Sequence, residues 1–211
     1  MIPMKINKLQ YIRYIRFIFI CFLFVGIKVY SQNIELLQLL AEAETDSGNY
    51  AKAVFYYNKI IEVNPDNSEA YAARAAAKGK LGNYEDGELD LSKAIELNPY
   101  LPKTYLKRAV FRLILQNYKG AMADCNVAVG LDDKNTEAFI TRGIAKSYIG
   151  YYTGAVEDFT SSIKLDSASS HAYANRGATK FYLGDSLGAL NDYSKAIKFD
   201  TNSFSLYYSR G

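Results

Sequence analysis

Apolar residues recur along most of the chain at helical spacing, in paired stripes separated by short polar turns. Residues 68–101 show the pattern clearly, because apolar side chains three and four positions apart share one face of a helix. The stripe residues are Tyr71, Ala75 and Leu81 in a first helix and Leu91, Ala94, Ile95 and Leu97 in a second. A Gly-Asn turn at residues 82–83 ends the first helix, and Asn98-Pro99 ends the second because proline cannot continue a helix. No β-type alternation competes over residues 34–203, so the pattern predicts an all-α fold of helical hairpins.

The hairpin pattern repeats every 34 residues. Five series of similar residues keep this spacing in one register, which chance does not produce. They are Arg74, Arg108, Arg142, Arg176 and Arg210; Asp90, Asp124, Asp158 and Asp192; Tyr50, Tyr84, Tyr118 and Tyr152; Leu81, Leu115, Ile149 and Leu183; and Ile61, Ile95, Val129, Ile163 and Ile197. We therefore divide residues 32–203 into five tandem units, at 34–67, 68–101, 102–135, 136–169 and 170–203, and residues 204–211 begin an incomplete sixth.

The unit length, the helix–turn–helix pattern and the small, aromatic and proline positions resemble the tetratricopeptide repeat (TPR) family. The resemblance covers residues 34–203 and part of 204–211, and it implies a right-handed α-solenoid of helix–turn–helix units. The chain departs from the family at one position of each unit, where a charged residue replaces a frequent aromatic one. We expect these side chains to be solvated: Glu44, Lys78, Arg112, Lys146 and Lys180.

The arginine and aspartate series predict structural ion pairs within the units. The first unit has Leu40 at the arginine position and Tyr56 at the aspartate position, so both charges are lost together. An aspartate paired with the next unit's arginine is disfavoured, because Arg74 would then face Tyr56. The predicted pairs are Arg74–Asp90, Arg108–Asp124, Arg142–Asp158 and Arg176–Asp192, since the guanidinium group suits carboxylate geometry.

The resemblance also implies that the first helices of the units line a concave groove that binds a partner. Groove positions are polar in the first unit and become apolar and aromatic from the third unit on. The candidate partner-binding residues are Leu106, Val110, Leu113, Ile140, Ile144, Tyr148, Phe181 and Tyr182. Exposed apolar residues of this kind usually mark a binding site, although solenoid units also pack against one another through apolar side chains. We expect an apolar or amphipathic peptide or helix as ligand, because the lysine and asparagine clamp that some relatives use for acidic C-termini is incomplete.

The N-terminus has the layout of a secretory signal. Basic residues without any acidic one precede and flank an apolar run of 11 residues at 17–27, too short to span a membrane easily. The layout is similar to the signals of Bacteroidetes-type bacteria, with cleavage expected after Ser31 and an uncleaved membrane anchor as the alternative. The whole chain of 211 residues has 25 basic and 22 acidic residues, a net charge of +3, and removal of residues 1–31 takes away five basic residues and leaves −2. We therefore expect a periplasmic or cell-surface protein of a Gram-negative bacterium.

No pattern of residues indicates catalysis. His171 is the single histidine and has no partner at motif spacing, Cys125 occupies a core position, and no phosphate-binding or metal-binding motif is present in the sequence. Basic residues interleave with acidic ones, which argues against nucleic acid. We expect a non-enzymatic scaffold for a protein or peptide partner, without cofactor or small-molecule substrate. The alternative is a structural subunit of an envelope assembly that self-associates through residues 204–211.

Overall fold

The computed structural model describes residues 34–210, so the expected signal at residues 1–31 lies outside the described residues. Residues 34–65 and residues 66–210 belong to two compact units, which are described one at a time below. In both, every regular element is a helix, and no strand occurs among the described residues. The fold is therefore all-helical, as the sequence predicts.

The N-terminal unit is one helical hairpin. Residues 34–46 form its first helix and α2 (Tyr50–Val63) its second. Gly48, at φ +79°, makes the turn between them, a backbone conformation that glycine adopts without a steric penalty. Ala41 of the first helix and Ala53, Tyr57 and Ile60 of the second are buried. Small residues on both helices thus let the two backbones approach.

The C-terminal unit is a row of helical hairpins. The helices are α3 (Ser68–Lys80), α4 (Tyr84–Leu97), α5 (Pro102–Ile114), α6 (Tyr118–Leu131), α7 (Thr136–Tyr148), α8 (Tyr152–Leu165), α9 (Ser170–Tyr182), α10 (Ser186–Phe199) and α11 (Phe204–Arg210). Both the odd-numbered and the even-numbered helices begin at intervals of 34 residues. The sequence period is therefore also the structural period.

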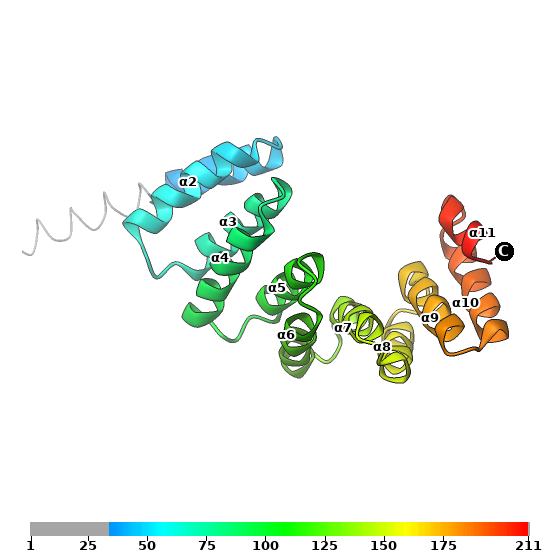
Figure 1. Cartoon of the computed structure of the whole chain (residues 1–211). Coiled ribbons are helices and arrows are strands. Elements are labelled where there is room, and N and C mark those ends of the chain that lie inside the picture. Colours follow the sequence, from blue (N-terminus) through cyan, green and yellow to red (C-terminus); the bar gives the residue numbers. More distant parts are fainter. Residues whose placement is uncertain (1–33, 211) are drawn as a thin grey trace, which may run out of the picture. The chain divides into compact units, whose positions relative to one another are not determined.

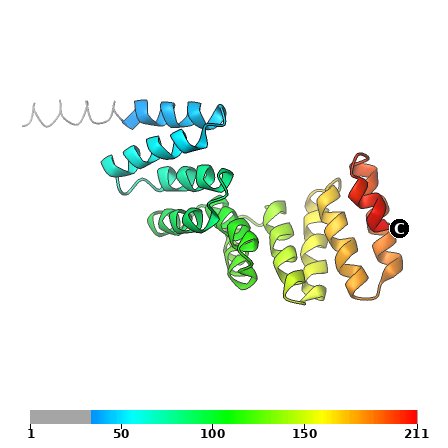
Figure 2. The ribbon, with the colours of Figure 1, turned by 45° about the horizontal axis from the view of Figure 1, so that its top comes forward.

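Within this row, each helix packs against its neighbours in sequence (Figures 1 and 2). The two helices of a hairpin pair with each other, and α4, α6 and α8 each pack against the first helix of the next hairpin. In addition, α5 touches α7 and α7 touches α9. The helices α5, α7 and α9 therefore form one continuous surface, the first-helix face.

The turns inside the hairpins depend on one special backbone position. Gly82, Gly150 and Gly184 take φ values of +82°, +79° and +82° at the ends of α3, α7 and α9. The corresponding residue after α5 is Gln116, which takes the same left-handed region at φ 60°. A side chain in this region costs about 1–2 kcal/mol, so the third hairpin carries strain that the others avoid.

Phe111 of α5 packs the third hairpin of the chain (α5 and α6) against the second (α3 and α4). Its ring lies against Gly79 of α3 and Gly87 of α4, where a Cβ atom would come within 2.5 Å of Phe111 Cζ and 2.4 Å of Cε2, respectively. The same ring makes an edge-to-face contact with Tyr84, at 5.4 Å between centroids. The two glycines thus leave the space that the aromatic ring fills.

Candidate functional site

The arginine and aspartate series form four bidentate ion pairs, each within one hairpin. In each pair the arginine Nε and Nη2 atoms donate to the two oxygens of an aspartate 16 residues later. The Nε–Oδ2 distance is 2.8 Å for Arg74–Asp90, 2.9 Å for Arg108–Asp124, 3.0 Å for Arg142–Asp158 and 2.8 Å for Arg176–Asp192. The aspartates are buried, so these groups hold the hairpins together and are not free to bind a ligand.

The expectation that the second charged series is solvated is wrong for all five members, since Glu44 is also only 21% exposed. A carboxylate has about four lone-pair positions, and the arginine leaves room for another cation. Lys78, Arg112, Lys146 and Lys180 occupy that room, 2.9, 2.9, 2.8 and 2.8 Å from Oδ2 of the same aspartates. Their side chains are only 14–21% exposed. Glu44, in the hairpin without the aspartate, pairs instead with Lys52 at 3.6 Å.

The two cations hold Asp192 in its ionised form. Burial by itself raises the pKa of this carboxyl, but hydrogen bonds from Arg176 and Lys180 outweigh burial and hold the pKa below its ordinary value. Three of the four arginines also cross to the preceding hairpin, where each donates to a polar side chain at 3.0 Å. These contacts are Arg108 to Ser92, Arg142 to Asn126 and Arg176 to Thr160. The ion pairs are thus part of a network that also joins successive hairpins.

Three of the eight candidate groove residues pack between the hairpins. Leu106 is 7% exposed and forms a core cluster with Ala128 and Ala138, against which Val110 packs. Leu113 packs against the cluster around Cys125. The prediction that Leu106 belongs to a partner-binding surface is wrong, because a neighbouring hairpin covers this side chain and removes it from water. Val110 and Leu113 are half-buried, and their place in a partner-binding surface stays a prediction.

The other candidates lie on the first-helix face of α7 and α9. Ile140 and Ile144 are half-buried, whereas the aromatic side chains are open to solvent: Tyr148 is 67%, Phe181 63% and Tyr182 71% exposed. Each of the two tyrosines is held by a ring from the preceding hairpin. Tyr148 stacks on Tyr118 at 4.7 Å between centroids, and Tyr182 on Tyr152 at 5.5 Å. Stacking orients these large apolar rings without burying them.

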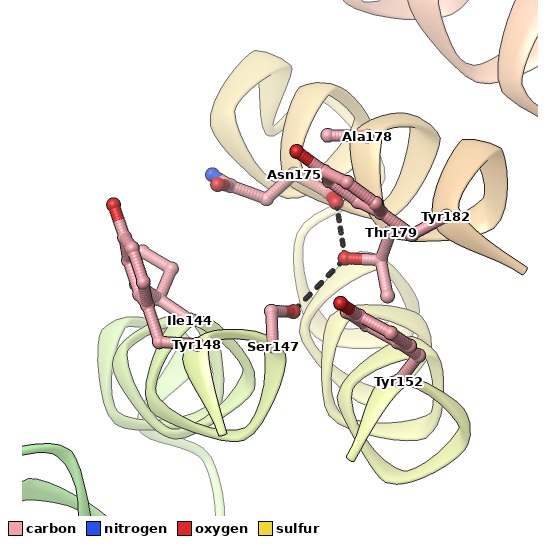
Figure 3. A pocket seen from close by; sticks show the side chains of 8 residues that line it. All are labelled: Ile144, Ser147, Tyr148, Tyr152, Asn175, Ala178, Thr179 and Tyr182. Carbon is pink, nitrogen blue, oxygen red and sulfur yellow. Dashed lines mark hydrogen bonds between the residues drawn. The ribbon is translucent and has the colours of Figure 1, made fainter. Parts of the chain in front are cut away.

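A hollow of about 340 Å³ lies beside these rings (Figure 3). It is lined by Ile144, Ser147 and Tyr148 of α7, Tyr152 of α8, and Asn175, Ala178, Thr179 and Tyr182 of α9. None of these side chains carries a charge at neutral pH. The lining combines apolar and aromatic surface with hydroxyl and amide groups, the usual composition of a binding pocket for a neutral group.

The polar groups of this hollow were not among the residues predicted from the sequence. Thr179 donates to the backbone oxygen of Asn175 at 2.8 Å, and its hydroxyl also contacts that of Ser147 at 3.0 Å (Figure 3). The residues corresponding to Ser147 are Thr45, Gly79, Leu113 and Phe181, and those corresponding to Thr179 are Ala43, Ala77, Phe111 and Ala145. A signal was present, because only in the fourth and fifth units do both positions that meet carry a hydroxyl; Thr45 of the first unit is followed by Ala77.

The described residues contain no group of three or more histidine, cysteine, aspartate and glutamate side chains placed to hold a metal ion. Cys125 is buried, and burial raises the pKa of its thiol to about 12, so the reactive thiolate is scarce at neutral pH. His171 is exposed on α9. Within residues 34–210, no helix combines the length and the apolar character that a membrane crossing needs.

Comparison with known proteins supports the repeat interpretation. Residues 34–77 and 68–100 match two tetratricopeptide repeat models. Among solved structures, residues 41 to the end of MamA from Desulfovibrio magneticus RS-1 superpose with a TM-score of 0.76 at 16% identity, covering 82% of this chain and 97% of that chain. The chain has the tetratricopeptide-repeat fold. No protein of curated function matches the sequence significantly.

Two further solved structures have the same fold. YrrB, described as a TPR protein with an unusual peptide-binding site, has a TM-score of 0.71 at 20% identity and covers 81% of this chain and 88% of that chain. PilF of Pseudomonas aeruginosa has a TM-score of 0.74 at 15% identity, covering 85% of this chain and 82% of that chain. At these identities the likeness concerns the fold alone.

Tyr207 and Tyr208 of α11 are exposed, and self-association through residues 204–211 stays a prediction.

Proposed function

We propose that the chain is a protein-interaction scaffold that binds an apolar or amphipathic peptide segment on the first-helix face of α7 and α9. The observation that carries the proposal is the pair Tyr148 and Tyr182, which line an uncharged hollow, with Phe181 in edge contact with Tyr182; all three rings are more than 60% exposed. Large aromatic side chains dominate binding energy at interfaces, and their exposure on a free surface is unfavourable. The peptide-binding site of YrrB, a TPR protein with the same fold, supports a peptide as the class of ligand.

The paired charges support the choice of an uncharged ligand. The arginines and lysines of α7 and α9, such as Arg142 and Lys180, already bond buried aspartates. A peptide carboxylate would have to compete with these intramolecular pairs. We therefore place the ligand's apolar or aromatic side chains, and not a charged terminus, in the hollow.

The test is a peptide selection followed by affinity measurement. Linear peptides are selected from a display library on the full chain, and their dissociation constants are measured by fluorescence anisotropy. Replacement of both Tyr148 and Tyr182 by alanine is expected to weaken binding about tenfold or more, because each ring contributes contact area at the centre of the site. The matched control is Tyr100→Ala, which removes a ring that is 78% exposed on the turn between α4 and α5.

Unchanged affinity of the double variant, with its helix content intact by circular dichroism, would refute the proposed site. An equal loss in the Tyr100→Ala control would also count against it, since that ring lies on a turn outside the first-helix face. The control thus separates a specific loss from a general response to removing an exposed tyrosine.

We also propose that the scaffold works outside the cytoplasm. The proposal rests on the basic residues and the short apolar run within residues 1–31. Expression of the full chain in a Gram-negative host, fractionation and N-terminal sequencing test it. A mature protein in the periplasm or at the cell surface that begins at Gln32 is expected, and a full-length cytoplasmic protein would contradict the proposal.

A further inference from the structure

The hollow between α7 and α9 has a defined hydrogen-bonding polarity. The hydroxyl of Thr179 has a single hydrogen, which it donates to the backbone oxygen of Asn175 at 2.8 Å. At its 3.0 Å contact with Ser147, Thr179 must therefore act as the acceptor, and the Ser147 hydroxyl as the donor. This leaves Ser147 Oγ with its hydrogen used and its lone pairs available to accept.

The other residues that line the hollow limit which chemical group of a ligand can bind at Ser147 Oγ. Thr179 is 2% exposed, so Ser147 is the accessible member of this hydroxyl pair (Figure 3). A carboxylate would bring its own lone pairs against those of Ser147. A lysine ammonium would lose its hydration, because the hollow offers no acidic side chain. A neutral donor avoids both penalties.

The walls of the hollow favour an aromatic carrier of that donor. Tyr148 and Tyr182 present exposed rings, and Ile144 and Ala178 add apolar surface. The volume of about 340 Å³ is at the lower end of the range of about 300–1,000 Å³ for small-ligand pockets, a size that suits one large side chain. An indole offers an aromatic body and an N–H group that only donates.

We infer that the hollow between α7 and α9 binds a tryptophan side chain of the partner peptide, with the indole N–H donating to Ser147 Oγ. The inference rests on the proposed peptide-binding function and specifies the residue that the site selects. The hydroxyl pair of Ser147 and Thr179 has no counterpart in the corresponding positions of the other hairpins, so the selectivity belongs to this one junction.

The experiment compares two probes that differ in the donor alone. N-acetyl-tryptophanamide carries the indole N–H, and the amide of N-acetyl-3-benzothienylalanine has a sulfur atom in its place. Each probe is titrated into the ¹⁵N-labelled full chain, and dissociation constants are taken from chemical shift changes. The tryptophan probe is expected to bind about three- to tenfold more tightly, the usual effect of one neutral hydrogen bond. Resonances of α7 and α9 around the hollow are expected to shift with both probes.

The Ser147→Ala variant removes the acceptor and keeps the helix, since alanine favours helical backbone. In this variant the two probes are expected to bind equally, at about the affinity of the benzothienyl probe for the wild type. Equal binding of both probes to the wild type would overturn the inference, and so would a preference that survives in Ser147→Ala. Either result leaves the proposed function intact if selected peptides still require Tyr148 and Tyr182. Absence of any peptide binding at these tyrosines would instead defeat the proposed function.

Discussion

The contact of Phe111 with Gly79 supports a specific prediction about the junction of the second and third hairpins. A Cβ atom at Gly79 would lie 2.5 Å from Phe111 Cζ and 3.0 Å from Cε1, about 1 Å closer than ordinary carbon contacts. The ring cannot move far to relieve this contact, because Gly87 borders it on another side, with a Cβ distance of 2.4 Å. Gly79→Ala therefore forces strain into the junction.

The expected change in the free energy of unfolding for Gly79→Ala is the difference between two opposing effects. Overpacking of a filled site costs about 1–3 kcal/mol. Alanine in place of glycine within α3 gains about 0.5–1 kcal/mol of helix stability. We expect Gly79→Ala to lower the free energy of unfolding by about 1–2 kcal/mol. When Phe111 is first replaced by alanine, the clash is gone and the same change is expected to stabilise the chain by about 0.5–1 kcal/mol.

Urea unfolding of the full chain, followed by circular dichroism at 222 nm, measures all four members of this double-mutant cycle. The sign reversal between the two backgrounds is the decisive result, because helix propensity alone would give a stabilisation in both. A destabilisation of equal size in the Phe111→Ala background would refute the reasoning, as would a stabilisation in the wild-type background.

Four further outcomes are expected from the same unfolding assay. Gln116→Gly removes the backbone strain of a side chain at φ 60° and should raise the free energy of unfolding by about 1 kcal/mol, whereas Gln116→Ala keeps the strain and should not. Ser162→Ala removes a buried hydroxyl that has no hydrogen-bond partner and should stabilise by about 1 kcal/mol; a loss of stability would show that the hydroxyl is satisfied. Leu106→Asp places a carboxylate in the core and should cost more than about 3 kcal/mol, visible as loss of helix content at 25 °C. The pKa of Asp192 is lowered in the folded chain, so its carboxylate contributes fully to the free energy of unfolding above pH 3.8, and this contribution is lost as the pH falls further. The urea midpoint of the wild type should therefore drop in acid, and that of Asp192→Asn should drop less steeply.

The arrangement of the helices could be predicted from local information. Helix starts, turns and hairpin ends depend on residues close in sequence, and repetition every 34 residues strengthens each signal. The arginine–aspartate pairs were also predictable, since Leu40 and Tyr56 replace both partners in the same unit. The sequence also contained a signal for the second cation that bonds each aspartate. This position holds Lys78, Arg112, Lys146 and Lys180 in the units with an aspartate, and the acidic Glu44 in the unit that lacks it.

The candidate site was predicted only in part, because exposure depends on contacts between hairpins. Leu106 and Ile144 have the same apolar character in the sequence, yet the first is buried in the junction and the second borders the hollow. Tyr148 and Tyr182 remain exposed because each is stacked on one ring, Tyr118 or Tyr152, that covers only part of its surface.

The sequence by itself determined the repeat period, the all-helical hairpins and the internal ion pairs, since these depend on spacing within one unit. The tertiary structure decided which apolar residues are covered, which cations share an aspartate, and where Ser147 and Thr179 meet. Those two hydroxyls are 32 residues apart and belong to different hairpins. Their contact depends on the packing of α7 against α9, which no single unit of the sequence specifies.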